Sequence, residues 1–142
     1  MAKFQVIVGD WSGDGHEKTQ TFLVVVDDRF TSEILAANYR KNVAELGVDP
    51  TTFAAEYEDR SIPADVAKIL DSYGVVYNEY KGESFMEDDA MTRVGMFNIM
   101  MFLFGHGLEG FSWEQEFTNY PVLVGEYRSA IGPEAVGYGL FV

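Results

Sequence analysis

The stretch TQTFLVVV, residues 19–26, consists largely of β-branched and aromatic residues, and this composition predicts a β-strand. A similar run, FQVIV at residues 4–8, precedes it, and the loop Gly9–Lys18 that joins the two is rich in glycine. Two strands connected in this way predict an antiparallel hairpin. At the other end of the chain, AVGYGLFV at residues 135–142 predicts a closing strand.

Between the hairpin and the closing strand, apolar residues recur at the three- and four-residue spacing of helices. The first helix is expected to begin at Thr31 or Ser32, either of which can cap it, and to end near Leu46 because Gly47 follows. Prolines and glycines mark the bounds of the others. The predicted helices cover residues 31–46, 51–58, 62–73 and about 90–104.

The helix predicted at 90–104 is apolar on nearly every side from Met96 onward, which is typical of a buried helix. Its periodicity places one face in the core of the protein. The residues expected on that face are Val94, Phe97, Met101 and Phe104.

Other segments are less regular. Val75–Tyr80 predicts a strand, and residues 111–120 are aromatic and irregular. Residues 121–130 fit either a strand or a helix, and Pro121 favours the helix. The order of strands, helices and strands predicts an α+β fold. We expect a single domain over residues 1–142, in which a small antiparallel sheet, made of the N-terminal hairpin and the C-terminal strand, packs with about four helices.

The charge of the chain limits its partners. Its 142 residues include 23 acidic and 10 basic ones, for a net charge of −13. Such a charge argues against direct binding of a nucleic-acid backbone or of an anionic membrane. It permits cations, basic proteins or mimicry of nucleic-acid charge. The sequence has no cysteine, no signal-peptide pattern and no apolar run of the ~20 residues that a membrane span needs, so we expect a cytoplasmic protein.

The hairpin loop is a candidate cation site. Asp10, Ser12 and Asp14 alternate along it, and the glycine after Asp14 permits a sharp bend, so that the carbonyl of His16 can also turn inward. Oxygen ligands in this arrangement suit Ca²⁺. The same residue types are ordinary turn formers, so a simple turn is the alternative. A third reading is a partner contact through Trp11, because tryptophan is favoured at interaction hot spots.

The loop resembles the D-x-[DN]-x-DG calcium loops. It departs from an EF-hand because the twelfth position is Thr21 and strands flank it. It is similar to the calcium loop of integrin-type propeller repeats, with Ser12 in place of Asn, but the ninth position is Lys18 where those repeats have an acid. The resemblance covers about a dozen residues and occurs once, so it implies a shared loop chemistry and no propeller.

The two histidines of the chain, His16 and His106, both lie in glycine loops. If these loops meet, the two imidazoles can form a mixed nitrogen and oxygen site with Asp14 and Glu109. Such a donor set suits Zn²⁺, Fe²⁺ or Mn²⁺. Alternatively, His106 caps the end of the buried helix, where a positive charge is favourable.

The sequence has no G-x-S-x-G motif, no P-loop, no H-E-x-x-H motif and no G-x-G-x-x-G motif after a predicted strand. We therefore expect a small acidic protein-binding or accessory module that presents the loop 10–17, with or without a divalent cation. A metal-assisted, hydrolase-like enzyme that uses His16 and His106 with nearby carboxylates is the first alternative. An acidic nucleic-acid mimic that inhibits a basic protein is the second, although the acids are scattered among many aromatic residues.

Overall fold

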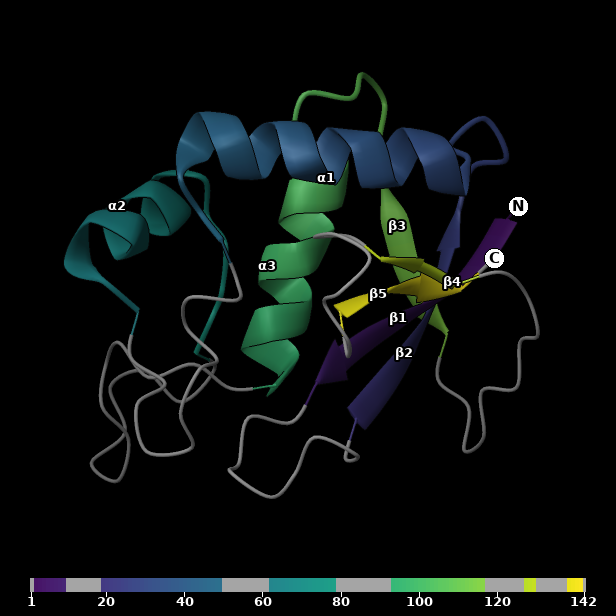
Figure 1. Ribbon diagram of the computed structural model, residues 1–142, viewed down its shortest axis with the longest axis horizontal. Coiled ribbons are helices and arrows are strands. Elements are labelled where there is room, and N and C mark those ends of the chain that lie inside the picture. Colours follow the sequence, from purple (N-terminus) through teal and green to yellow (C-terminus); the bar gives the residue numbers. More distant parts are fainter. Residues whose placement is uncertain are drawn as a thin grey trace.

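The computed structural model of the protein describes residues 2–9, 19–49, 62–78, 93–116, 127–129 and 138–141. These residues form an antiparallel sheet and three helices, so the expected α+β class is confirmed (Figure 1). The expectation that residues 1–142 make a single domain stays a prediction. Within the described residues, no helix is both long and apolar enough to cross a membrane.

The predicted N-terminal hairpin is present. β1 (Ala2–Gly9) pairs with β2 (Thr19–Val26) in an antiparallel register that runs from Ala2 opposite Val26 to Gly9 opposite Thr19. The predicted C-terminal strand also forms: β5 (Tyr138–Phe141) pairs with the other edge of β1. Two further strands, β3 (Trp113–Glu116) and β4 (Tyr127–Ser129), extend the sheet to the order β3-β2-β1-β5-β4.

The first helix, α1 (Ser32–Leu46), begins and ends where the sequence predicts. The hydroxyl of Thr31 accepts a 3.3 Å hydrogen bond from the amide of Ile34, which satisfies one of the free donors of the first turn. Gly47 ends the helix with a φ of 70°, a left-handed conformation that glycine adopts without strain. α2 (Ala64–Ser72) follows, and α3 (Arg93–Gly105) comes third.

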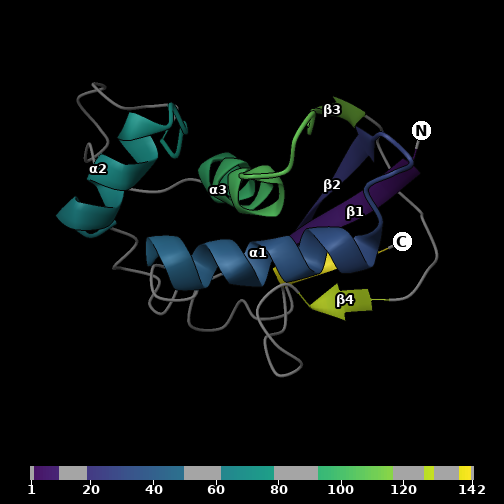
Figure 2. The same cartoon turned by 90° about the horizontal axis from the view of Figure 1, so that it is seen from above.

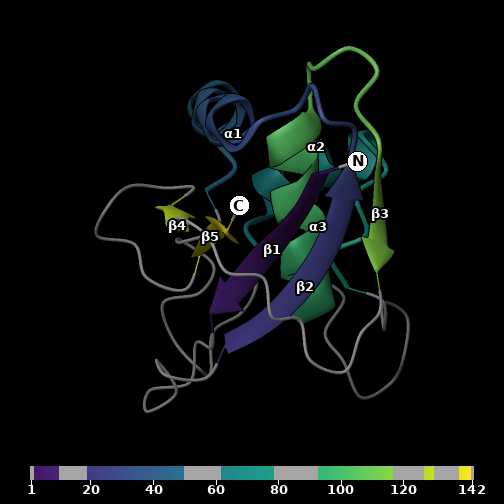
Figure 3. The same ribbon diagram turned by 90° about the vertical axis from the view of Figure 1, so that its right-hand side faces the viewer.

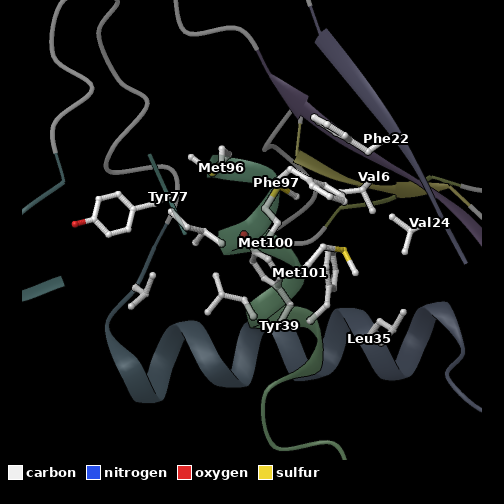
Figure 4. Close-up of a cluster of buried hydrophobic side chains, with 14 of the residues drawn as sticks. Val6, Phe22, Val24, Leu35, Tyr39, Tyr77, Met96, Phe97, Met100 and Met101 are labelled. Atoms are coloured by element: carbon white, nitrogen blue, oxygen red, sulfur yellow. The ribbon is translucent and has the colours of Figure 1, made fainter. Parts of the chain in front are cut away.

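The core lies between the sheet and α3. α3 packs behind β1 and β2 (Figure 3), and α1 runs across it at a steep angle (Figure 2). The ring of Phe97 on α3 stacks on that of Phe22 on β2, with centroids 4.1 Å apart. Buried side chains from the sheet, α1 and α3 converge there (Figure 4), among them Val6, Phe22, Val24, Leu35, Tyr39, Met96, Phe97, Met100 and Met101.

Several sequence-based expectations were wrong. Phe97, Met101 and Phe104 are buried as expected, but Val94 is 40% exposed. Val94 lies in the first turn of α3, which begins at Arg93. Residues 75–78 form no strand, since the chain there folds against α3: the side-chain amide of Asn98 donates to the Val76 carbonyl.

The remaining differences concern two strands that follow α3 and the number of helices. Residues 127–129 are a strand, so a helix over 121–130 was wrong for this part. Residues 113–116 also form a strand, within a segment expected to be irregular. The described residues contain three helices where about four were expected, and the helix predicted at 51–58 lies outside the described residues.

Candidate functional site

The chain makes a compact loop where α3 ends and β3 begins. Two glycines in this loop, Gly107 and Gly110, have φ angles of 89° and 74°, which other residues rarely adopt. Two main-chain hydrogen bonds close successive turns, from the Leu108 amide to the Gly105 carbonyl and from the Phe111 amide to the Leu108 carbonyl. The chain thereby reverses direction and delivers Trp113 to the edge of the sheet.

Two asparagines of α1 bind the end of α3. The last four carbonyls of a helix have no partner within it. The side-chain amide of Asn42 donates to the Leu103 carbonyl at 2.7 Å, and that of Asn38 donates to the Phe104 carbonyl at 2.8 Å. Both amides also donate to the His106 carbonyl, each at 2.9 Å. Both hydrogens of each amide group are therefore used.

The other two terminal carbonyls of α3 are satisfied by the loop itself. The His106 amide donates to the Phe102 carbonyl at 2.8 Å, and the Leu108 amide donates to the Gly105 carbonyl. Because Asn38 and Asn42 are both buried, water cannot easily replace their bonds. The end of α3 is thus held in a fixed position relative to α1.

The far side of the loop is held by aromatic packing. Phe111 meets Phe30 edge to face, with centroids 5.2 Å apart, and it lies so close to Gly105 that any side chain at that position would overlap with its ring. Arg29 donates to the Gly110 carbonyl at 3.2 Å, and its guanidinium lies 4.7 Å from the centre of the Phe30 ring. These contacts fix the loop to the turn that precedes α1.

Between the end of α3 and β3 lies an open cleft of about 410 Å³, which we call the α3–β3 cleft. Aromatic side chains dominate its lining, and a hydroxyl and an imidazole are its polar groups. The residues that line it are Met101, Phe102, Gly105, His106, Phe111, Ser112 and Trp113.

One side of the α3–β3 cleft is backed by a buried ring of the core. Trp113 packs edge to face on Phe97, with centroids 5.2 Å apart, so the cleft is built directly on the core. At its other side Tyr73, which is 50% exposed, lies within about 5 Å of both Phe102 and His106, at 5.2 and 4.7 Å. This arrangement offers a half-buried aromatic surface, which can bind an apolar or aromatic group from a partner.

His106 is a member of this aromatic cluster. Its imidazole lies 4.9 Å from the ring of Phe102 as well as beside Tyr73. Glu109 is exposed on the same loop. Within the described ranges, no group of three or more His, Cys, Asp or Glu side chains is arranged to hold a metal ion.

The residues predicted for the hairpin loop lie outside the described residues; these are Asp10, Trp11, Ser12, Asp14 and His16. The strand residues that flank the loop are described: Gly9 and Thr19 pair with each other at one end of the hairpin. Trp113, which follows the His106 loop, pairs with Val26 at the opposite end of β2. An eight-residue strand spans roughly 25 Å, so the two histidine loops leave the sheet far apart.

Sequence reasoning missed most of the α3–β3 cleft. The segment 111–120, which contains Phe111, Ser112 and Trp113, was expected to be irregular. Tyr73 was expected only as the last residue of a predicted helix. The available signal was the density of aromatic residues after a glycine loop. For Asn38 and Asn42, the signal was their four-residue spacing on the apolar face of a predicted helix, where asparagine is unusual.

No protein-family model matches this chain. Comparison with characterised proteins gives no significant match, and neither does comparison with solved structures.

Proposed function

We propose that this protein is a small acidic protein-binding module and that the α3–β3 cleft receives an apolar side chain of its partner. The observation that carries the proposal is the aromatic lining of a cleft that is open to solvent and rigidly backed by the core. Tryptophan, tyrosine, phenylalanine and methionine are the residue types enriched at the centres of protein interfaces. All four occur in or beside this cleft.

The construction of the cleft supports binding without a large rearrangement. The loop 105–110 is fixed on one side by Asn38 and Asn42 and on the other by Arg29 and Phe30. A surface that is ordered before binding loses less conformational entropy when the partner arrives. The net charge of −13 favours a basic partner, because opposite charges speed encounter and exclude wrong partners.

The hairpin loop is the second surface of the proposed module. Trp11 is its candidate contact residue, and a divalent cation held by Asp10, Ser12, Asp14 and His16 would order it. Ca²⁺ is the preferred ion. The metal-assisted enzyme would need His16 and His106 to share one site, with Zn²⁺ or Mn²⁺, although the His16 loop is attached at the Thr19 end of β2 and the His106 loop reaches the sheet at its Val26 end. The nucleic-acid mimic has no supporting observation in the described part of the chain.

Selection from a displayed library of random twelve-residue peptides tests the proposal. We expect enriched peptides that carry an aromatic or large aliphatic residue. These peptides should bind Trp113→Ala at least about tenfold more weakly than the wild type, the loss expected when an interface anchor is removed. Because Trp113 also packs on Phe97, a second variant is needed. Ser112→Lys places bulk and charge in the cleft at an exposed position, and it should weaken binding while it leaves the melting temperature nearly unchanged.

Trp11→Ala is the matched control at the hairpin loop. Peptides that depend on Trp11 and ignore both cleft variants would move the binding surface to that loop and overturn the assignment to the cleft. If no peptide is enriched over the immobilised blank, the protein-binding proposal itself fails.

A further inference from the structure

The α3–β3 cleft is bordered by a strand at the edge of the sheet. β3 pairs with β2 along one side, and among the described residues no strand pairs with its other side. The other edge strand of the sheet, β4, contributes nothing to the lining of the cleft. A row of main-chain donors and acceptors at such an edge can pair with an additional extended chain.

We propose that the partner segment is an extended, lysine- or arginine-containing peptide that adds to the sheet beside β3 and places an apolar side chain in the α3–β3 cleft. This inference rests on the proposed function, because it specifies the chemistry of the partner at the same site. The main chain of β3 would supply affinity, and the side chains on either side of the sheet would supply specificity.

The side chains of β3 divide the two faces of the sheet. Trp113 and Gln115 are half-buried and lie opposite Val26 and Val24, which face the core. Their neighbours Glu114 and Glu116 are exposed on the other face. Side chains of an added strand alternate between the same two faces. One set would therefore pass over the cleft, and the other set would lie beside two carboxylates.

The charges near β3 indicate which charge the partner's side chains should carry on the face of Glu114 and Glu116. Glu109, Glu114 and Glu116 are exposed on β3 and the loop before it. Lys3 of β1 forms a 3.0 Å ion pair with Glu116, which shows that an ammonium group is accommodated on this face. Basic side chains at alternate positions of the partner would have the complementary charge, whereas acidic ones would be repelled.

A designed probe distinguishes this mode of binding. The probe is a heptapeptide amide with lysine at its odd positions and valine, phenylalanine and valine at its even positions. Titration into the ¹⁵N-labelled full chain, followed by amide chemical shifts, should move signals of β3 and of residues 105–113. A matched peptide with glutamate in place of lysine should bind at least about tenfold more weakly at low salt, and higher salt should reduce the difference.

Methylation of the peptide nitrogens tests the strand pairing itself. In an antiparallel or parallel ladder, an added strand bonds to its neighbour through alternate residues. A single N-methyl group should therefore weaken binding about tenfold at alternate positions and have little effect at the positions between them. Ser112→Lys should weaken every peptide of the series.

The outcomes separate the two proposals. If N-methylation has no two-residue period, or if the lysine peptide does not bind, the strand-addition inference is overturned. The proposed function then still stands if library peptides bind in a manner that depends on the cleft. If cleft variants affect neither the library peptides nor the heptapeptide, both proposals are overturned.

Discussion

The side-chain amide of Asn42 donates a 2.9 Å hydrogen bond to the main-chain oxygen of His106, 64 residues further along the chain. Asn38, one helical turn earlier, donates to the same oxygen at the same distance. A carbonyl oxygen has two lone pairs, and here each is used by a different asparagine. This pair of bonds connects α1 with the loop that forms one wall of the α3–β3 cleft.

We expect Asn38→Ala and Asn42→Ala each to lower the free energy of unfolding by about 1–3 kcal/mol, because each leaves a buried carbonyl of α3 without a donor. The double variant should lose more than the sum of the two, since only then does the His106 carbonyl lose both partners. Chemical denaturation of the four proteins measures this coupling.

Asn98→Ala is a matched control for the asparagine pair. Asn98 also donates to a main-chain carbonyl, that of Val76, but Val76 is 55% exposed and water can replace the bond. The loss should stay below about 1 kcal/mol. Equal losses at all three asparagines, or additive losses at Asn38 and Asn42, would contradict a shared acceptor.

Gly95 and Gly105 are expected to resist substitution for different reasons. A methyl group at Gly95 would overlap with the main-chain carbonyl of Tyr77, whereas one at Gly105 would overlap with the ring of Phe111. Gly95→Ala should therefore destabilise the protein by about 1–3 kcal/mol, despite the better helix propensity of alanine. Gly105→Ala should be destabilising in the wild type and much less so in a Phe111→Ala background. Thermal or chemical denaturation measures both.

The contribution of helix propensity to that comparison can be measured separately at an exposed position of α1. Ala44 is exposed there, so Ala44→Gly should cost about 1 kcal/mol through propensity alone. If Gly95→Ala instead stabilises the protein by a similar amount, the close approach of α3 to Tyr77 is wrong.

Phe97→Ala is expected to be among the most destabilising single changes. Phe97 is 1% exposed and packs between Phe22 and Trp113, so the substitution leaves a cavity and should cost about 3–5 kcal/mol. Val94→Ala on the same helix is the comparison: Val94 is 40% exposed, and its loss should be below about 1 kcal/mol. Urea titration distinguishes the two, and similar losses would show that the first turn of α3 is buried as the sequence suggested.

The parts of the fold that sequence predicted are those determined by neighbouring residues. β2 has five β-branched residues in eight, and α1 is bounded by Thr31 and Gly47, whose roles as caps depend only on the adjacent turn. β3, in contrast, has the sequence WEQE, with no β-branched residue. It is a strand because it pairs with β2, some 90 residues earlier in the chain, and no local pattern records that pairing.

The candidate site was harder to predict for the same reason. The α3–β3 cleft is assembled from residues at the end of α3 and the start of β3, with Tyr73 from the end of α2 beside them. His106 was identified from its flanking glycines, and among the described residues the rings of Tyr73 and Phe102 lie beside its imidazole. A motif search favours ligands that are close in sequence, whereas this surface depends on which elements pack together.

The prediction of a cation site in the hairpin loop rests on the sequence alone. If Asp10, Ser12 and Asp14 converge on Ca²⁺, the ion stabilises the folded state by RT ln(1 + [L]/Kd), which is about 2.7 kcal/mol at a concentration about 100 times Kd. The melting temperature should then rise with added Ca²⁺ in the wild type. It should not respond in Asp14→Ala, which lacks one ligand and one negative charge.

Lys18→Asp provides the opposite test of the same loop. The substitution removes an ammonium group from the ninth position and supplies a carboxylate there, so Ca²⁺ should bind more tightly and raise the melting temperature further than in the wild type. A turn without an ion would behave differently: Asp14→Ala would still destabilise it by removing a turn-forming side chain, but the wild type and both variants would melt independently of Ca²⁺. That flat response would refute the cation site and leave Trp11 as the candidate contact residue of the loop.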